Sequence, residues 1–165
     1  MKKTTFLFAL LCSLVSFSQS KTAYINFNEL VQQMPEFKAA NDSALIITKE
    51  YQSQLDNIVT ELKTKGEIFE KDSKSYKPEI YDYKLNEIKD LQSRVEGFKK
   101  TAETAIQKQK DELLNPIIKK AKDAVEQVAK SKGYSYVIDS GKENYVYLDP
   151  KADLMELVKK ELKLN

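Results

Sequence analysis

The chain has 165 residues, of which 27 are Lys or Arg and 25 are Asp or Glu, with one Cys and no His. It therefore has no imidazole for acid–base catalysis and too few thiols for a site that binds a metal through several thiolates. The charges nearly balance, and nucleic-acid binding requires clustered positive charge, so we expect no nucleic-acid partner.

The N-terminal segment predicts export. Lys2 and Lys3 form a basic start, residues 6–15 are apolar, and small residues follow at Ser16 and Ser18. This pattern is typical of a cleavable signal peptide, and the apolar stretch is too short to span a bilayer, for which about 20 residues are needed. We expect residues 1–18 to be removed and residues 19–165 to form a single exported domain.

Cys12 leaves a lipoprotein alternative open. Leu11 directly before it is bulky where lipoprotein processing prefers a small residue, so a cleaved product without lipid is favoured. Cleavage would remove the only Cys together with Lys2 and Lys3. The mature chain would then have 25 residues of each sign, no net charge and no capacity for a disulfide.

The mature chain begins with two short predicted elements. Residues 21–27 are rich in aromatic and β-branched side chains, which predicts a strand. Asn28 is a suitable cap for a short helix that runs to Met34. Pro35 suits the first turn of the next helix.

From Glu36 to Lys132 the sequence predicts two long helices that fold back on each other at Lys77-Pro78. Seam positions in the first helix are spaced alternately by four and three residues, and apolar residues of the second also share one face, as in a coiled coil. Four of the first set are polar, so we expect a loose seam. The first set is Phe37, Asn41, Ala44, Thr48, Tyr51, Leu55, Ile58, Leu62, Lys65, Phe69, Asp72 and Tyr76. The second set is Tyr81, Leu85, Ile88, Leu91, Val95, Phe98, Ala102, Ile106, Leu113 and Ile117.

The two predicted helices differ in length, at about 60 and 80 Å for a rise of about 1.5 Å per residue. Counting equal numbers of residues from the turn along both helices places Glu36 opposite Lys119. The last turns of the second helix therefore have no partner in the first. Pro116, which removes one helical hydrogen bond, lies close to this point. The segment from Glu36 to Lys130 contains 18 basic and 18 acidic residues, so its charges balance.

The C-terminal region predicts a small sheet and one more helix. Gly133 is a suitable helix stop. Residues 134–139 and 144–148 are predicted to form two strands of a hairpin that turns at residues 140–143. Asp153, with Glu156 three residues later, predicts the start of a final helix.

Together these elements predict a mostly helical α+β protein. It would have a small β-body, residues 21–35 and 133–165, and a long antiparallel coiled-coil arm, residues 36–132. So small a body has exposed sheet edges and little buried surface, so we expect it to complete its core by oligomerisation. The apolar residues expected in this oligomer body are Tyr24, Ile25, Phe27, Val137, Ile138, Val146 and Leu148.

No pattern predicts catalysis, a cofactor or a metal ion. Asp139 and Asp149 flank the predicted hairpin strands, and ordinary polar residues at strand ends explain them better than an acid pair. Asn41 begins a glycosylation sequon, although its helical setting argues against modification. We therefore expect that the protein is not an enzyme.

Four aromatic residues lie close to the turn, Phe69, Tyr76, Tyr81 and Tyr83. One interpretation is that the first three close the end of the helical seam. The other is that the four contact an unfolded chain through an adaptable apolar and cationic surface. The lysines around them are Lys63, Lys65, Lys71, Lys74, Lys77 and Lys84.

Several short segments in a fixed order carry a family resemblance. They are Ala23-Tyr24-Ile25-Asn26-Phe27, Met34-Pro35-Glu36, Asn115-Pro116-Ile117, residues 128–139, and Tyr147-Leu148-Asp149-Pro150 leading into Asp153-Leu154. In these segments, and in the order signal peptide, strand, helical hairpin, strands and final helix, the chain resembles the Skp (OmpH-like) family of periplasmic chaperones for outer-membrane proteins. The resemblance implies a homotrimer with a central β-body and three helical arms that enclose an unfolded client, without enzyme activity or cofactor.

The resemblance also implies a function. It is that of a periplasmic, ATP-independent holdase that binds unfolded outer-membrane proteins and delivers them for outer-membrane assembly. Family members are often strongly basic whereas this mature chain is neutral, so its association with membranes stays open. The alternative is a structural or adaptor protein of the envelope with one fixed partner. The loose seam favours the holdase, because a fixed coiled coil would keep a stricter apolar heptad.

Overall fold

The computed structural model describes residues 20–142 and 144–164, and the predicted signal peptide lies outside them. These residues form two compact units. The arm unit is Val31–Lys120, and the body unit consists of residues 20–30 and 121–164. The last turns of the long helix α4, from Ala121 onward, group with the body unit; these are the turns for which the sequence analysis found no partner in the first helix.

The body unit begins with strand β1, Thr22–Ile25, and helix α2 starts at Phe27. The expected strand is thus shorter than residues 21–27, and Phe27 is helical. Asn26 caps the helix in place of the predicted Asn28, because its Oδ1 accepts a hydrogen bond from the Glu29 amide at 3.1 Å. The short helix ends at Gln32, within the arm unit.

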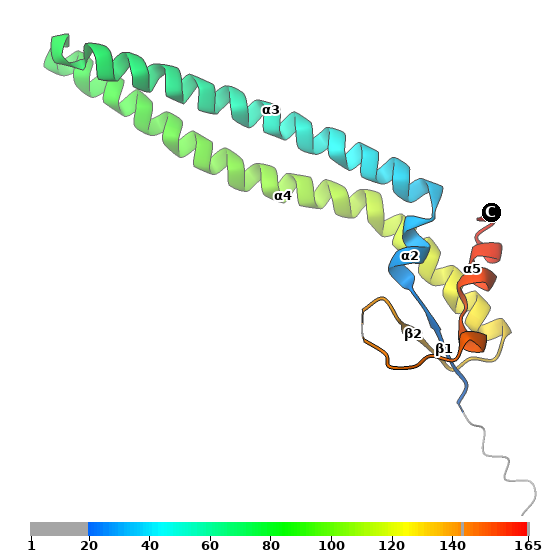
Figure 1. Cartoon of the computed structure of the whole chain (residues 1–165). Coiled ribbons are helices and arrows are strands. Elements are labelled where there is room, and N and C mark those ends of the chain that lie inside the picture. Colours follow the sequence, from blue (N-terminus) through cyan, green and yellow to red (C-terminus); the bar gives the residue numbers. More distant parts are fainter. Residues whose placement is uncertain (1–19, 143, 165) are drawn as a thin grey trace, which may run out of the picture. The chain divides into compact units, whose positions relative to one another are not determined.

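Two long antiparallel helices make up the arm unit, α3 at Pro35–Asp72 and α4, which spans Pro78–Ser131 and continues into the body unit. Figure 1 shows them side by side. Both begin on a proline, whose fixed φ suits the first helical position. A short 3₁₀ turn, Ser73–Ser75, and the extended residue Tyr76 join them, as the turn signal at Lys77-Pro78 predicted.

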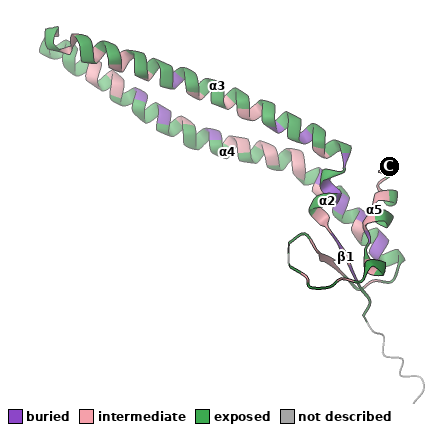
Figure 2. Ribbon diagram, viewed as in Figure 1, coloured by how far each residue is buried: buried purple, intermediate pink, exposed green. Residues whose placement is uncertain are grey.

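A single line of apolar side chains between the helices forms the core of the arm unit. Ile58, Leu91 and Val95 are buried at its centre, and the ring of Tyr51 lies 6.3 Å from that of Phe98. Figure 2 shows separate buried patches on α3 and α4 among intermediate and exposed residues. Leu55, Leu62 and Phe98 pack against the central three.

The body unit contains a two-stranded parallel sheet. Strand β2, Tyr136–Asp139, pairs with β1 in a register that aligns Thr22 with Tyr136 and Ile25 with Asp139. Gly133, with φ 70°, ends the preceding helix as predicted, because this left-handed conformation suits glycine. The buried apolar residues of the unit are Ala23, Ile25, Leu30, Ala121, Ala124, Val128, Ala129, Leu154 and Val158.

The predicted hairpin between residues 134–139 and 144–148 is wrong. Residues 144–148 form no strand, and β2 pairs with β1 instead. Asp139 fixes the chain as it leaves β2, since its Oδ1 accepts hydrogen bonds from the amides of Phe27 and Gly141, both at 3.1 Å. Within this segment Val146 is fully exposed, whereas Tyr145 and Leu148 are partly buried.

The C-terminal segment returns to the sheet. It contains a 3₁₀ turn, Pro150–Ala152, and helix α5, Met155–Glu161. The Leu154 amide donates to the Tyr24 carbonyl at 3.0 Å. Leu154 is the N-cap of the helix, and Asp153 Oδ1, one residue earlier, accepts from the Met155 amide at 2.8 Å. Across residues 20–142 and 144–164, no helix combines the length and apolar character needed to cross a bilayer.

Candidate functional site

Three of the four aromatic residues predicted near the turn lie together. The ring of Phe69 on α3 is 5.0 Å from that of Tyr81 and 6.2 Å from that of Tyr76, in tilted arrangements. Aromatic pairs prefer such geometries and add stability beyond the area they bury. This aromatic cluster therefore closes the end of the helical seam, although Tyr81 remains 39% exposed.

Tyr83 lies outside the aromatic cluster. Its side chain is 63% exposed, and the Lys84 ammonium lies 5.5 Å from the centre of its ring. Two further large apolar residues near the turn, Ile68 and Ile80, are 48% and 47% exposed. Exposure of a large apolar side chain to water costs free energy. Several such side chains gathered at one place therefore indicate a contact surface.

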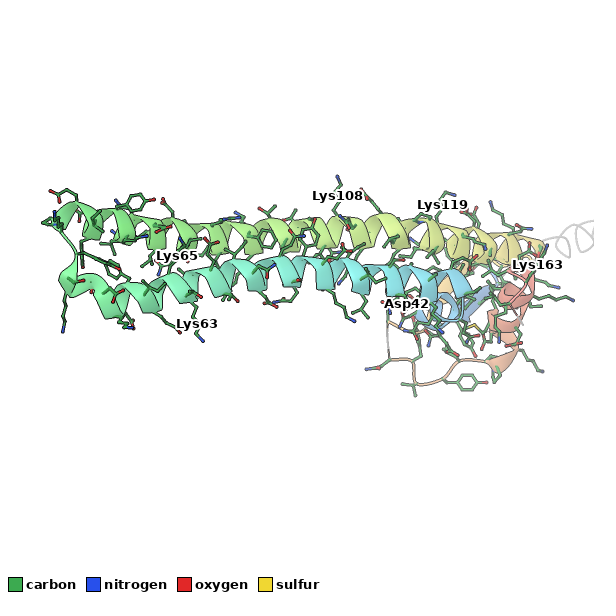
Figure 3. The ribbon with its side chains drawn as sticks, turned by 90° about the horizontal axis from the view of Figure 1, so that it is seen from above. Asp42, Lys63, Lys65, Lys108, Lys119 and Lys163 are labelled. Atoms are coloured by element: carbon green, nitrogen blue, oxygen red, sulfur yellow. The ribbon has the colours of Figure 1, made fainter. Side chains whose placement is uncertain are left out.

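An ion triad borders these exposed residues. Lys65 on α3 forms an ion pair with Glu87 on α4, and Lys84 lies 3.2 Å from the other oxygen of the same carboxylate. Figure 3 shows Lys65 between the two helices, whereas Lys63 points away from α4. The hydrogen bonds that Lys65 and Lys84 donate to Glu87 lower the pKa of Glu87, and the hydrogen bond to Glu87 raises the pKa of Lys65.

The seam carries other polar residues that the sequence marked as interruptions. Asn41 is exposed, and the neighbouring Ala40 takes the buried place. Thr48 satisfies its hydroxyl by donating to the Ala44 carbonyl at 2.8 Å. Lys65 is accommodated by its ion pair. The seam is therefore thin, and the polar side chains Thr48 and Lys65 that interrupt it have partners.

Exposed apolar residues also lie farther along α3, at Leu45, Ile46 and Val59, which are 53%, 59% and 41% exposed. The sequence analysis missed these three, together with Ile68 and Ile80. A signal was present, because each is a large apolar residue that lies outside the predicted seam positions. Such residues either lie outside the core or indicate a second contact surface.

The residues expected in the oligomer body occupy different environments. Ile25 is buried, and Val146 projects fully into solvent. Tyr24, Phe27, Val137, Ile138 and Leu148 are partly exposed. Burial, with Asp153 and Asp149 nearby, raises the pKa of the Tyr24 phenol. Tyr147, next to Val146, is 78% exposed, so the segment after β2 presents uncovered apolar surface.

The carboxylates considered as an acid pair have local roles. Asp139 accepts the two main-chain hydrogen bonds at the end of β2, and Asp149 Oδ1 accepts from the Lys151 amide at 3.0 Å. In residues 20–142 and 144–164, no group of three or more acidic side chains is placed to hold a metal ion.

A shallow depression of about 580 Å³ lies on α4. All of its lining residues come from this helix, and a single helix does not enclose a ligand. Figure 3 shows Lys108, one of them, pointing away from α3. The lining residues are Glu103, Thr104, Gln107, Lys108, Asp111, Glu112 and Asn115.

The two-helix arm and the small sheet between the chain ends define a class of protein. Residues 21–162 match the family described as outer membrane protein (OmpH-like), and the chain belongs to this family. It is 25% identical over 153 residues to the chaperone protein Skp of Yersinia enterocolitica, covering 93% of this chain and 92% of that protein.

A solved structure has the same fold. It comes from Caulobacter crescentus CB15 and is described as an OmpH-like candidate outer membrane chaperone. The TM-score is 0.71 over 88% of this chain and 85% of the other, at 10% sequence identity. The predicted family and the mostly helical α+β fold are thus confirmed.

Proposed function

We propose that the protein is a periplasmic holdase that binds unfolded outer-membrane polypeptides and protects them from aggregation until they reach the outer membrane. Membership of the OmpH-like family and the likeness to a chaperone support this role. The observation that carries it is the set of large apolar side chains that the arm unit leaves exposed. They are Leu45, Ile46, Val59, Ile68, Ile80, Tyr81 and Tyr83.

This mode of binding requires no nucleotide. Each exposed side chain offers a small apolar area, and burial of apolar surface contributes about 25 cal/mol per Å² without a defined direction. Many such contacts suit clients of different sequence, and each is weak enough to exchange. Release then follows when the client finds a more favourable site. The proposal assigns no chemical step and no cofactor to the protein.

We further propose that three copies assemble through the body unit, the number coming from the family resemblance. Val146 and Tyr147 are 105% and 78% exposed, and Tyr136 on β2 is 64% exposed. A second copy would cover this apolar surface. Light scattering at micromolar concentration should give the mass of a trimer, and a stably folded monomer would contradict the assembly.

The holdase function is tested with a denatured outer-membrane protein diluted into buffer. Stoichiometric amounts of this protein should suppress the rise in light scattering equally with and without ATP. Undiminished aggregation of the client would overturn the proposal, and suppression only with ATP would overturn its mechanism. Affinity capture from envelope extract separates the adaptor alternative, which predicts one folded partner in fixed ratio instead of many unfolded chains.

A further inference from the structure

One side of the arm unit near the turn carries exposed apolar residues from both helices. Lys65 on α3 forms an ion pair with Glu87 on α4. The helix faces that carry these two residues therefore lie on the same side of the arm unit. Ile68 lies three positions after Lys65. Tyr83 and Ile80 lie four and seven positions before Glu87. Residues at these spacings share a helix face, so Ile68, Ile80 and Tyr83 form one surface, the lateral patch.

The register of the hairpin places these residues close together along the arm. Phe69 and Tyr81 face each other with their rings 5.0 Å apart. Ile68 precedes Phe69 by one residue and Tyr83 follows Tyr81 by two, so both lie within about one turn of that pair. Tyr83 is also near enough to Lys65 to contribute to its raised pKa. The lateral patch therefore has residues from both helices at about the same distance from the turn.

Charge distinguishes between possible occupants of the lateral patch. Lys65 and Lys84 both pair with Glu87, and Glu61 lies 4.0 Å from Lys65. The two ammonium groups at the border are thus compensated by carboxylates. An anionic lipid headgroup would have to displace these carboxylates, whereas an uncharged apolar segment leaves the ion triad in place. The patch fits a polypeptide segment better than a membrane surface.

The dimensions favour an extended segment. Ile80 and Tyr83 are about 4.5 Å apart along α4 at 1.5 Å per residue, and packed helices lie about 8–10 Å apart. Same-side residues of an extended chain are spaced by about 6.8 Å. The lateral patch can therefore cover two successive side chains on one side of an extended strand. Strands of outer-membrane barrels alternate apolar and polar residues in this way.

We propose that the lateral patch is the main contact on the arm for extended client segments in which apolar and polar residues alternate. This inference rests on the proposed holdase function and gives it a location and a preferred client pattern. The aromatic cluster supports the patch from within, since Phe69 and Tyr81 hold the two helices together beneath it.

The test compares two double variants of the full-length protein. Ile80→Ser with Tyr83→Ser removes most of the lateral patch, and Leu45→Ser with Ile46→Ser removes comparably exposed apolar side chains elsewhere on the arm. Affinity for an unfolded outer-membrane protein should fall about tenfold in the first, because each lost apolar contact changes the constant by a factor of a few. It should fall by a smaller factor, about twofold to threefold, in the second variant, because Leu45 and Ile46 belong to the exposed apolar set of the arm but lie outside the lateral patch.

Two further measurements make the test specific. Circular dichroism and light scattering should show that both variants keep the helical content and mass of the wild type, and Tyr83→Phe should bind as the wild type does. An uncharged peptide with alternating apolar and polar residues should shift the NMR signals of Ile68, Ile80 and Tyr83 more than a peptide of equal composition whose apolar residues are adjacent.

Each outcome has a distinct meaning. The wild type binding the client while both double variants lose affinity equally would show that the lateral patch is not the main contact. The same holds where neither variant loses affinity. The holdase function stands in both cases. Equal shifts by the two peptides would overturn the preference for alternation. Binding to anionic vesicles that is lost in the patch variant alone would assign the patch to lipid. If the wild type binds no unfolded client, the proposed function itself fails.

Discussion

Glu36 in the first turn of α3 accepts a hydrogen bond from the Lys120 ammonium of α4 at 2.5 Å, across 84 positions of sequence. Equal residue counts on both sides of the turn predicted Lys119 as the residue opposite Glu36, one residue from the observed partner. The pair lies at the end of the arm unit, which closes at Lys120. The equal spacing of residues along both helices is what made this partner predictable.

The Glu36–Lys120 pair should make a small, pH-dependent contribution to stability. The hydrogen bond from Lys120 lowers the pKa of Glu36 from its ordinary value of 4.5, so the folded state favours the charged form. The contribution is fully present above pH 4.5 and is lost as the pH falls through the lower folded value. Because both side chains are about half exposed, Glu36→Gln should cost only about 0.2–1 kcal/mol at pH 7.

Urea unfolding of wild type and Glu36→Gln at several pH values measures this difference. Glu50→Gln, at an exposed position of α3, is the control for the loss of one negative charge. A difference that grows as the pH falls below 4.5 would contradict the assigned sign.

The thin seam should be sensitive to loss of its central side chains. Leu91 is 6% exposed and packs with Ile58 and Val95, so Leu91→Ala should destabilise the arm by about 2–3 kcal/mol through lost burial and a cavity. Ile46→Ala, at a position that is 59% exposed, should change stability by less than about 0.5 kcal/mol. Denaturant unfolding followed by circular dichroism gives both values, and equal effects would show that Leu91 is not central.

Two glycines should respond to alanine in opposite directions. A Cβ at Gly141 would lie 2.6 Å from Asn26 Oδ1, and this oxygen cannot move away without losing the cap of α2. We expect Gly141→Ala to destabilise the body by about 1–2 kcal/mol. A Cβ at Gly97 meets nothing within 4 Å, so Gly97→Ala should stabilise α4 by about 1 kcal/mol. Thermal unfolding of both variants measures these effects. A Gly141→Ala protein as stable as the wild type would show that the turn at Gly141 shifts to accommodate the new Cβ.

Client affinity should depend weakly on salt. Glu36 to Lys130 contains 18 residues of each sign, and exposed charges are screened over about 8 Å at physiological salt, whereas apolar contact is not screened. Affinity for an unfolded outer-membrane protein should therefore change little between low and near-molar salt, and Tyr83→Ser with Phe69→Ser should weaken it. Because Phe69 belongs to the aromatic cluster, Tyr83→Ser alone is the cleaner variant. A steep loss of client affinity with salt, together with unchanged affinity in the Tyr83→Ser variant, would show that the lysines near the turn bind the client instead.

Helical periodicity made most of the arm predictable. A helix repeats its contacts every three to four residues, so the sequence around Ile58 and Leu91 already contains the information about which residues face the partner. Lys65 looked like a defect in the seam because its compensating partner, Glu87, is 22 positions away. The candidate site was predicted in part. Phe69, Tyr76 and Tyr81 followed the seam pattern, whereas Ile68 and Ile80 lie beside it.

The sheet was less predictable for a physical reason. A hairpin is the simplest partner for residues 134–139, and a local pattern cannot show that β1, more than 100 positions earlier, is the strand that β2 joins. Pairing at such distance depends on the packing of the whole unit. Val146, which the hairpin prediction placed in a strand, is exposed in the single chain.

The parallel pairing of β1 with β2 also sets an order of folding. Thr22 meets Tyr136 only after the intervening chain is available, and closing so long a loop carries an entropic cost that local helical contacts do not. Helices α3 and α4 can pair, starting from their connecting turn, before β1 and β2 have paired. On the proposed export from the N-terminus, β1 remains unpaired until β2 has emerged, and the sheet of the body forms after the helical arm.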